Sequence, residues 1–287
     1  MIIVRYSEIG LKGKNRAFFE KALAKNIALA AKRAGIKIAS ISRPYGRLMV
    51  DCEQWSFLKT VFGIASYSPA FDGGSSISTA MKKLSEARAL DKFVGKTFRV
   101  SCQRLDKTFA MSSEMICREL GAAIIAHTGA KAKMTAYDIE LGVEVIKGRL
   151  WLFTERVQGL GGLPLGVEGR VVGLLKSEKD VLAALLMMKR GCEIIPVLLK
   201  SKKIDTSLLE SFGNTVKPIT LTKPSELDKL INQTGGKAIV TGQTLSDFSN
   251  LSSKSIVLRP LITFSDKEIS EKLGFYTEIS REALQAS

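Results

Sequence analysis

The chain has 287 residues, of which 45% are hydrophobic and 25% charged, a composition typical of a folded, soluble protein with two or three domains. The N-terminus does not resemble a signal peptide, and the longest apolar run, residues 181–188, is too short to span a bilayer. Four scattered cysteines and a single histidine argue against a zinc site, a disulfide framework or a histidine-based triad. The net charge of +15 favours a polyanionic partner, so we predict a cytoplasmic protein without membrane contact, although charge alone does not separate RNA, DNA and anionic lipid.

The first sixty residues predict a small α+β unit. Its expected elements are a strand at residues 2–6, a helix at 16–34, and strands at 36–42 and 47–51 around the turn Pro44-Tyr45-Gly46. This stretch contains 12 basic and 4 acidic residues, so more than half of the net charge lies in a fifth of the chain.

Residues 61–166 predict a second α+β unit. A further helix and an apolar segment are expected within residues 52–77, and Asp72-Gly-Gly-Ser-Ser is expected as a loop. The remaining expected elements are helices at 77–90 and 112–128 and strands at 97–102, 137–146 and 149–154. Residues 157–169 contain five glycines and a proline, a composition typical of a linker or tight surface loop.

From Arg170 onward, strands alternate with helices. The expected strands are residues 171–175, 193–199, 215–221, 237–241 and 255–258, and the expected helices are 178–190, 205–212, 224–233 and 266–273. This alternation predicts βαβ units and a parallel sheet, whose ligands bind at the carboxyl ends of the strands.

Four separated segments carry a family resemblance, and they occur in the family's own order. They are VRYSEIGLKGKNRAFFEKALAKNI at 4–27, VQGLGGLPLG at 157–166, ALLMMKRG at 184–191 and IVTGQTLSDFSNLSSKSIVLRPLI at 239–262. Together they resemble the tRNA 4-thiouridine synthetases, sulfurtransferases that are also linked to thiamine biosynthesis. Several motifs in register are more specific than any one of them.

The resemblance implies an α+β N-terminal half followed by a small α/β domain with a parallel sheet. We expect a ferredoxin-like domain at residues 1–60, a THUMP RNA-binding domain at 61–166, and a shortened PP-loop ATP-pyrophosphatase-like domain at 167–287. In the family, the first two domains bind tRNA, and the third uses ATP and Mg to adenylate uridine 8 before sulfur is delivered.

The candidate RNA-binding residues are basic or polar side chains of the first two domains. They are Lys12, Lys14, Asn15 and Arg16 around Gly13, then Lys96, Arg99, Arg104 and Lys107 along a strand and its loop, and Arg149 and Arg156 on the late hairpin. Cationic heads and the free N–H groups of a helix start both favour phosphate. The alternative is a solvated basic surface that binds nothing in particular.

The nucleotide loop departs from the family pattern. In place of Ser-Gly-Gly-x-Asp-Ser, the corresponding window reads Leu175-Lys176-Ser177-Glu178-Lys179-Asp180, without the glycines that let a backbone approach phosphate closely. The degenerate candidate nucleotide residues are Lys176, Ser177, Lys179, Asp180, Gly242, Gln243 and Arg259. Gln243 replaces a carboxylate, and Glu178 adds negative charge where phosphates would lie. The loop therefore does not support the ATP and Mg that the family uses.

The sulfur chemistry lacks its expected residue as well. The family uses a cysteine beyond the LRPL segment, whereas no cysteine follows Cys192 here and no rhodanese domain is expected. Cys192 is interpreted as a structural thiol, and no catalytic residue or metal ligand is assigned. Three hypotheses remain: a non-catalytic tRNA-binding protein; an active tRNA sulfurtransferase with a divergent nucleotide site or a partner-supplied sulfur cysteine; and an accessory subunit that presents tRNA to a separate thiolation enzyme. A sulfur carrier is a further possible partner.

Overall fold

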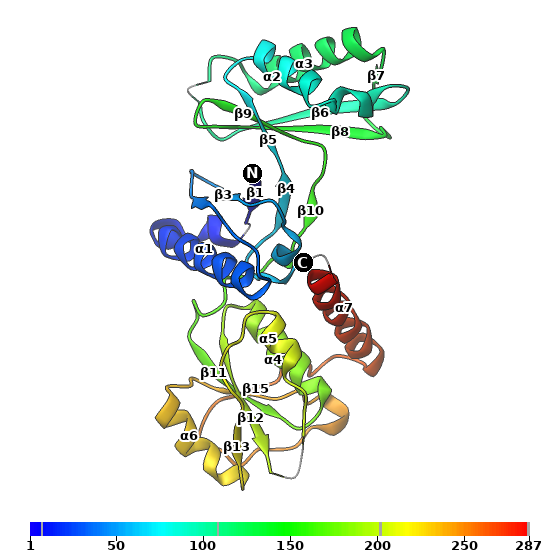
Figure 1. The fold of residues 1–287 in the computed structure, drawn as a ribbon. Helices are drawn as coiled ribbons and strands as arrows, with labels where there is room; N and C mark the ends of the chain where they lie inside the picture. Colours follow the sequence, from blue (N-terminus) through cyan, green and yellow to red (C-terminus); the bar gives the residue numbers. More distant parts are fainter. Residues whose placement is uncertain (7, 108, 201–202, 286–287) are drawn as a thin grey trace. The chain divides into compact units, whose positions relative to one another are not determined.

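The computed structural model describes residues 1–6, 8–107, 109–200 and 203–285 (Figure 1). The chain packs as two compact units, each built from separate stretches of sequence. Unit 1 comprises residues 1–5, 39–53 and 67–157, and unit 2 comprises residues 6–38, 54–66 and 158–287. Each unit is described by itself below.

Unit 1 contains a five-stranded sheet with the order β5-β9-β8-β6-β7. Its strands are β5 (Phe71–Gly74), β6 (Thr97–Arg104), β7 (Lys131–Ala132), β8 (Ile139–Ile146) and β9 (Arg149–Phe153). Two helices, α2 (Ile77–Glu86) and α3 (Ser113–Thr128), cover one face of this sheet (Figure 1), and the short 3₁₀ helix η4 (Ala89–Phe93) follows α2. Both helices begin with a serine cap, because the Ser76 and Ser112 hydroxyls accept hydrogen bonds from backbone N–H groups in the first turn.

The second sheet has the order β10-β4-β1-β3-β2. Its strands are β1 (Ile2–Arg5), β2 (Ser40–Ser42), β3 (Leu48–Asp51), β4 (Ser66–Pro69) and β10 (Val157–Gln158). Helix α1 (Arg16–Arg33) and the 3₁₀ helices η1 (Glu8–Leu11), η2 (Gly13–Asn15) and η3 (Ser56–Thr60) belong to unit 2.

A buried charge cluster joins distant parts of unit 1. Glu144 on β8 is 1% exposed and accepts hydrogen bonds from Arg5 Nε at 2.6 Å and from Arg47 Nε at 2.7 Å. Ser68 accepts from Arg5 at 3.0 Å, and Gln103 accepts from Arg47 at 2.7 Å. Burial lowers the pKa of Arg5, and Glu144 opposes that shift. One carboxylate therefore serves two guanidinium groups, an arrangement that tolerates no loss of the shared acid.

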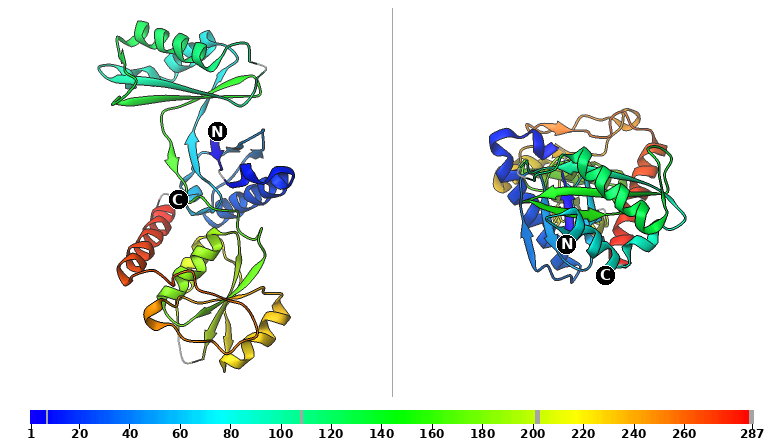
Figure 2. Two further views of the ribbon diagram at one scale, coloured as in Figure 1. Left: turned by 180° about the vertical axis from the view of Figure 1, so that it is seen from behind. Right: turned by 90° about the horizontal axis from the view of Figure 1, so that it is seen from above.

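Unit 2 contains a parallel sheet with the order β13-β12-β11-β14-β15. Its strands are β11 (Arg170–Leu175), β12 (Glu193–Leu199), β13 (Ile219–Leu221), β14 (Ile239–Val240) and β15 (Val257–Leu258). Helices α4 (Glu178–Lys189), α5 (Ser207–Ser211) and α7 (Asp266–Gln285) share one core with one face of the sheet, whereas α6 (Leu227–Thr234) packs on the other face. The view from behind in Figure 2 shows α4 and α6 on opposite sides of the strands. The 3₁₀ helices η5 (Pro224–Glu226) and η6 (Leu245–Asp247) complete the unit.

The predicted fold class is confirmed, and the individual differences have local causes. The expected loop at Asp72 begins instead as strand β5, because β9 supplies a pairing edge and a bulge between Asp72 and Gly74 accommodates the glycines. The helix expected at 266–273 continues to Gln285 despite Gly274, because Tyr276 and Ala283 are buried on its inner face. Among the described residues, no helix is both long and apolar enough to cross a membrane.

Candidate functional site

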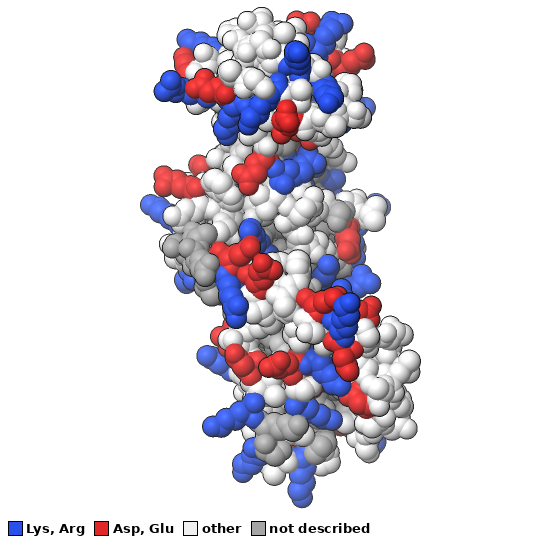
Figure 3. Space-filling view, turned by 90° about the vertical axis from the view of Figure 1, so that its right-hand side faces the viewer, with Lys and Arg blue, Asp and Glu red and all other residues white. Residues whose placement is uncertain are grey.

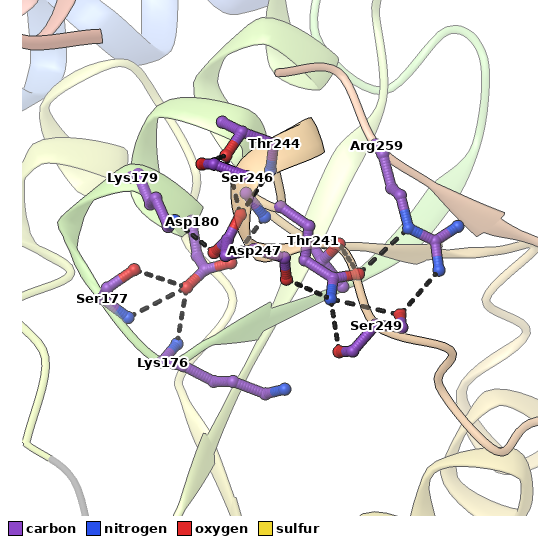
Figure 4. Close-up of polar contacts among 12 residues, drawn as sticks. Lys176, Ser177, Lys179, Asp180, Thr241, Thr244, Ser246, Asp247, Ser249 and Arg259 are labelled. Atoms are coloured by element: carbon purple, nitrogen blue, oxygen red, sulfur yellow. Dashed lines mark hydrogen bonds and ion pairs between the residues drawn. The ribbon is translucent and has the colours of Figure 1, made fainter. Parts of the chain in front are cut away.

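The turn from β11 into α4 is closed by the carboxylate of Asp180. Oδ2 of Asp180 accepts hydrogen bonds from the Lys176 and Ser177 backbone N–H groups at 3.0 and 2.9 Å, and from the Ser177 hydroxyl at 2.9 Å. Oδ1 accepts from the Gly242 backbone N–H at 2.5 Å. Asp180 is buried, so it acts as an internal anion at the start of the helix, where an external anion would otherwise bind (Figure 4).

Gly242 lies directly against this turn. A Cβ atom at position 242 would be 2.6 Å from the Lys179 carbonyl carbon and 2.7 Å from the Asp180 backbone nitrogen. The backbone after β14 therefore contacts the first turn of α4 with no space between them. Glycine here provides the close approach of two chain segments rather than of a chain segment and a phosphate.

A second set of contacts covers the same helix start. Lys179 forms an ion pair with Asp247 in η6, and Asp247 also accepts from the Thr244 N–H and hydroxyl, each at 2.7 Å. The hydrogen bond from Lys179 and those from Thr244 hold the pKa of Asp247 well below its ordinary value. Lys179 is therefore already paired and is not a free cation for a ligand.

The remaining residues of the expected nucleotide site contact one another. Gln243 Oε1 accepts a hydrogen bond from Arg259 Nε at 3.0 Å, and Gln243 Nε2 donates to the Ser249 hydroxyl at 2.7 Å. The Arg259 guanidinium also lies 4.8 Å from the centre of the Phe248 ring. The structure thus brings all seven expected nucleotide residues into one region.

The polar groups of that region do not fit a triphosphate cradle. The amides that would bind phosphate already donate to Asp180, and no cluster of three or more His, Cys, Asp or Glu side chains suited to a metal occurs among the described residues. Only Lys176 points away from the cluster, and its ammonium forms no ion pair with any described residue (Figure 4). A single half-buried lysine does not replace a glycine-rich loop.

Cys192 has the surroundings of a structural thiol. Its side chain is buried in the core that β11, β12 and α4 share. Burial raises the pKa of the thiol, which disfavours the nucleophilic thiolate at neutral pH.

The N-terminal cluster around Gly13 is only partly open. Lys12 lies 3.6 Å from Glu168 and over the Phe19 ring, and Arg16 donates to Glu20 at 2.8 Å and to the Tyr6 hydroxyl at 2.9 Å. Lys14 and Asn15 are exposed. The free N–H groups expected here are partly engaged, because the 3₁₀ turn η2 directs the N–H of Asn15 to the Lys12 carbonyl and the N–H of Arg16 to the Gly13 carbonyl.

The candidate residues of unit 1 divide in the same way. Arg149 forms a two-point ion pair with Asp72, and Arg104 donates to the backbone carbonyls of Lys107 and Phe109. Arg99 lies over the Tyr137 ring, and Arg156 lies over the Phe153 ring. The exposed candidates are Lys96, Lys107, Arg149 and Arg156. On the face shown in Figure 3, basic side chains are dispersed among acidic ones rather than gathered into one patch.

Sequence reasoning missed a row of lysines on α1. Lys21, Lys25 and Lys32 are exposed, and none forms an ion pair with a described residue. Their spacing of four and seven residues places them along one side of the helix, a signal that was available in the sequence. The helix contains one acidic residue, Glu20, which is bound to Arg16.

Two family models match the N-terminal half: the ThiI ferredoxin-like domain over residues 1–68 and the THUMP domain over residues 75–155. A probable tRNA sulfurtransferase of Thermococcus kodakarensis is 31% identical over 335 residues, which cover 96% of this chain and 88% of the relative. Another, from Caldanaerobacter subterraneus subsp. tengcongensis, is 30% identical and covers 98% and 87%. A matched span of 335 residues exceeds the 287 of this chain, so the Thermococcus relative contains internal segments that this chain lacks.

Two solved structures have the same fold over nearly the whole chain. PH1313 from Pyrococcus horikoshii Ot3 is 32% identical with a TM-score of 0.83, covering 95% of this chain and 99% of that one. A 4-thiouridine synthetase, solved as an RNA complex with bound ATP, is 27% identical with a TM-score of 0.77, covering 99% of this chain and 86% of that one.

Proposed function

Because this chain belongs to the tRNA sulfurtransferase family, we propose that it binds tRNA through its N-terminal half and does not adenylate it. In this proposal residues 1–60 and 61–166 form the RNA platform, and residues 167–287 are retained as a scaffold. The platform uses exposed cations such as Lys14, Lys96 and Arg156, together with the lysine row of α1. Structured RNA is bound largely through shape, phosphate and 2′-hydroxyl contacts, for which dispersed cations are sufficient.

One observation supports the loss of nucleotide activation above all others. The Asp180 carboxylate accepts hydrogen bonds from three backbone N–H groups at the β11–α4 turn and on the facing segment at Gly242. An incoming phosphate would have to displace a buried, covalently tethered anion and would add a second negative charge beside it. Both effects oppose nucleotide binding.

The test is an assay of AMP and pyrophosphate release from Mg·ATP by the purified protein, with and without tRNA. Binding of tRNA is measured in parallel by filter retention at several salt concentrations. A 4-thiouridine synthetase with an intact Ser-Gly-Gly-x-Asp-Ser loop serves as the positive control. We expect tRNA binding without tRNA-dependent release of AMP. Turnover would disprove the loss of activation, and a protein that does not retain tRNA would disprove the platform.

The sulfur step has its own variant. Cys192→Ser should leave both the fold and tRNA binding intact, because the thiol is buried and its pKa is raised. If a sulfur-transfer activity were measured in the wild type and lost in this variant, the structural interpretation of Cys192 would be wrong.

A further inference from the structure

The last turn of α1 carries a guanidinium group without a partner. Arg33 forms no ion pair or hydrogen bond with a described residue, although loss of hydration lowers its pKa. Its two terminal nitrogens lie 3.5 and 3.6 Å from the position that a Cβ atom would take at Gly213. Gly213 also has a φ of +100°, so a side chain there would be both strained and in the way of the guanidinium. The site therefore keeps room for a cation that nothing in the described chain neutralises.

A buried hydroxyl lies on the opposite wall. Ser280 on α7 is 6% exposed, and its hydroxyl has no hydrogen-bond partner among the described residues. Buried hydroxyls in folded proteins are normally hydrogen-bonded, so one without a partner indicates a missing ligand or water. The nearby hydroxyls of Ser207 and Ser211 differ in this respect, because they donate to Asp205 and to the Ser207 carbonyl.

Arg33 and Ser280 line the same hollow. It has a volume of about 310 Å³ and lies between the end of α1, η3, α5 and α7. Ala30, Ala34 and Phe57 form much of its apolar wall, and Glu210 lies at its margin. This volume is near the lower end of the range for small-molecule sites (about 300–1,000 Å³), so the hollow is larger than a lone inorganic ion requires.

We propose that this hollow binds a small organic anion, whose phosphate or carboxylate group pairs with Arg33 and accepts a hydrogen bond from Ser280. The body of the ligand packs against Phe57 and the two alanines. Glu210 accepts a hydrogen bond from a hydroxyl or amino group on that body. An ordinary nucleoside monophosphate and an aromatic amino acid both have this combination of groups. The site is separate from the Asp180 turn and does not depend on RNA binding.

Thermal unfolding of the full chain, without RNA, tests the site. The probes are AMP, phenylalanine, inorganic phosphate and adenosine, each titrated to 10 mM at constant ionic strength. A ligand present at ten times its Kd should raise Tm by roughly 2–5 °C. The variants are Arg33→Gln and Ser280→Ala, and the matched control is Lys32→Gln, which removes the neighbouring exposed cation outside the hollow.

The outcomes are distinct. A shift with AMP that is lost in Arg33→Gln, reduced in Ser280→Ala and kept in Lys32→Gln supports the site and identifies phosphate as the anionic group. The same pattern with phenylalanine supports the site and identifies carboxylate. No shift with any anionic probe, an equal shift in Arg33→Gln, or a shift with adenosine alone would overturn the proposal.

Discussion

The starts of helices α1 and α4 offer an instructive comparison, because both were candidate anion sites and they are built in opposite ways. Helix α1 has no acidic residue in its first turn, and its Asn15 cap makes no side-chain hydrogen bond. Helix α4 has Glu178 and Asp180 in its first turn, and Asp180 binds the backbone of its own turn and of Gly242. The first start leaves Lys14 open to solvent, and the second closes on itself.

The difference shows that a positive helix end is not sufficient for a ligand site. The macrodipole favours an anion at both starts. What decides the outcome is whether the protein supplies that anion from its own chain. Asp180 does so for α4, whereas α1 is preceded by basic residues only, at Lys12 and Lys14. The four predictions below test this contrast, from the largest expected effect to the smallest.

Replacing Lys12, Lys14 and Arg16 together with alanine should weaken tRNA binding by about 100-fold at moderate salt. Each lost phosphate contact should reduce the slope of log K against log salt by roughly 0.7–0.9. Salt-dependent filter binding measures both quantities. Lys267→Ala on α7, which removes an exposed lysine paired with Glu271, is the control for net charge. An unchanged slope in the triple variant would remove the α1 start from the RNA surface.

Asp180→Ala should destabilise the protein by about 3 kcal/mol, because three backbone N–H groups lose a charged acceptor in a buried site. Urea denaturation measures the free energy of unfolding. Glu178→Ala removes the same charge from an exposed position in the same turn and should change stability by less than about 0.5 kcal/mol. Equal effects of the two substitutions would mean that Asp180 is not the group that closes the turn.

Gly242→Ala should destabilise by roughly 1–3 kcal/mol, because its Cβ would overlap the backbone of Lys179 and Asp180. Gly274→Ala on α7 is the matched control, since no atom lies within 4 Å of the added Cβ. That substitution should stabilise the protein by roughly 0.5–1 kcal/mol, as expected for alanine in a helix. A neutral Gly242→Ala would show that the segment after β14 can move away from α4.

The Lys179–Asp247 pair should make a small, pH-dependent contribution below about 1 kcal/mol, since both side chains are partly exposed. The folded-state pKa of Asp247 is lowered, so this stabilisation is present above about pH 4 and is lost as the pH falls through the folded pKa. Comparing wild type with Asp247→Asn in urea at pH 6 and pH 3 measures it. A difference that grows toward pH 3 would contradict the assigned sign.

The sequence was sufficient for the fold but not for the closed turn. Alternating strands and helices after Arg170 predicted the parallel sheet, and the missing glycines predicted a changed loop. The contact between Asp180 and Gly242 could not be predicted in this way, because 62 residues separate them and only the pairing of β11 with β14 brings them together. The missed length of α7 has a related cause. Gly274 weakens the local helix preference, and burial of Tyr276 and Ala283 compensates for it.

The Arg5–Glu144–Arg47 cluster affects how this protein can exchange parts with its relatives during evolution. The ferredoxin-like match ends at residue 68 and the THUMP match begins at residue 75, which suggests two interchangeable modules. The shared carboxylate makes them one unit of inheritance. A recombination event that imported a THUMP segment without an acid at position 144 would leave Arg5 and Arg47 facing each other without a counter-charge, at a cost of about 3–5 kcal/mol. Viable exchanges would have to carry both modules, or the acid and its two arginines, together.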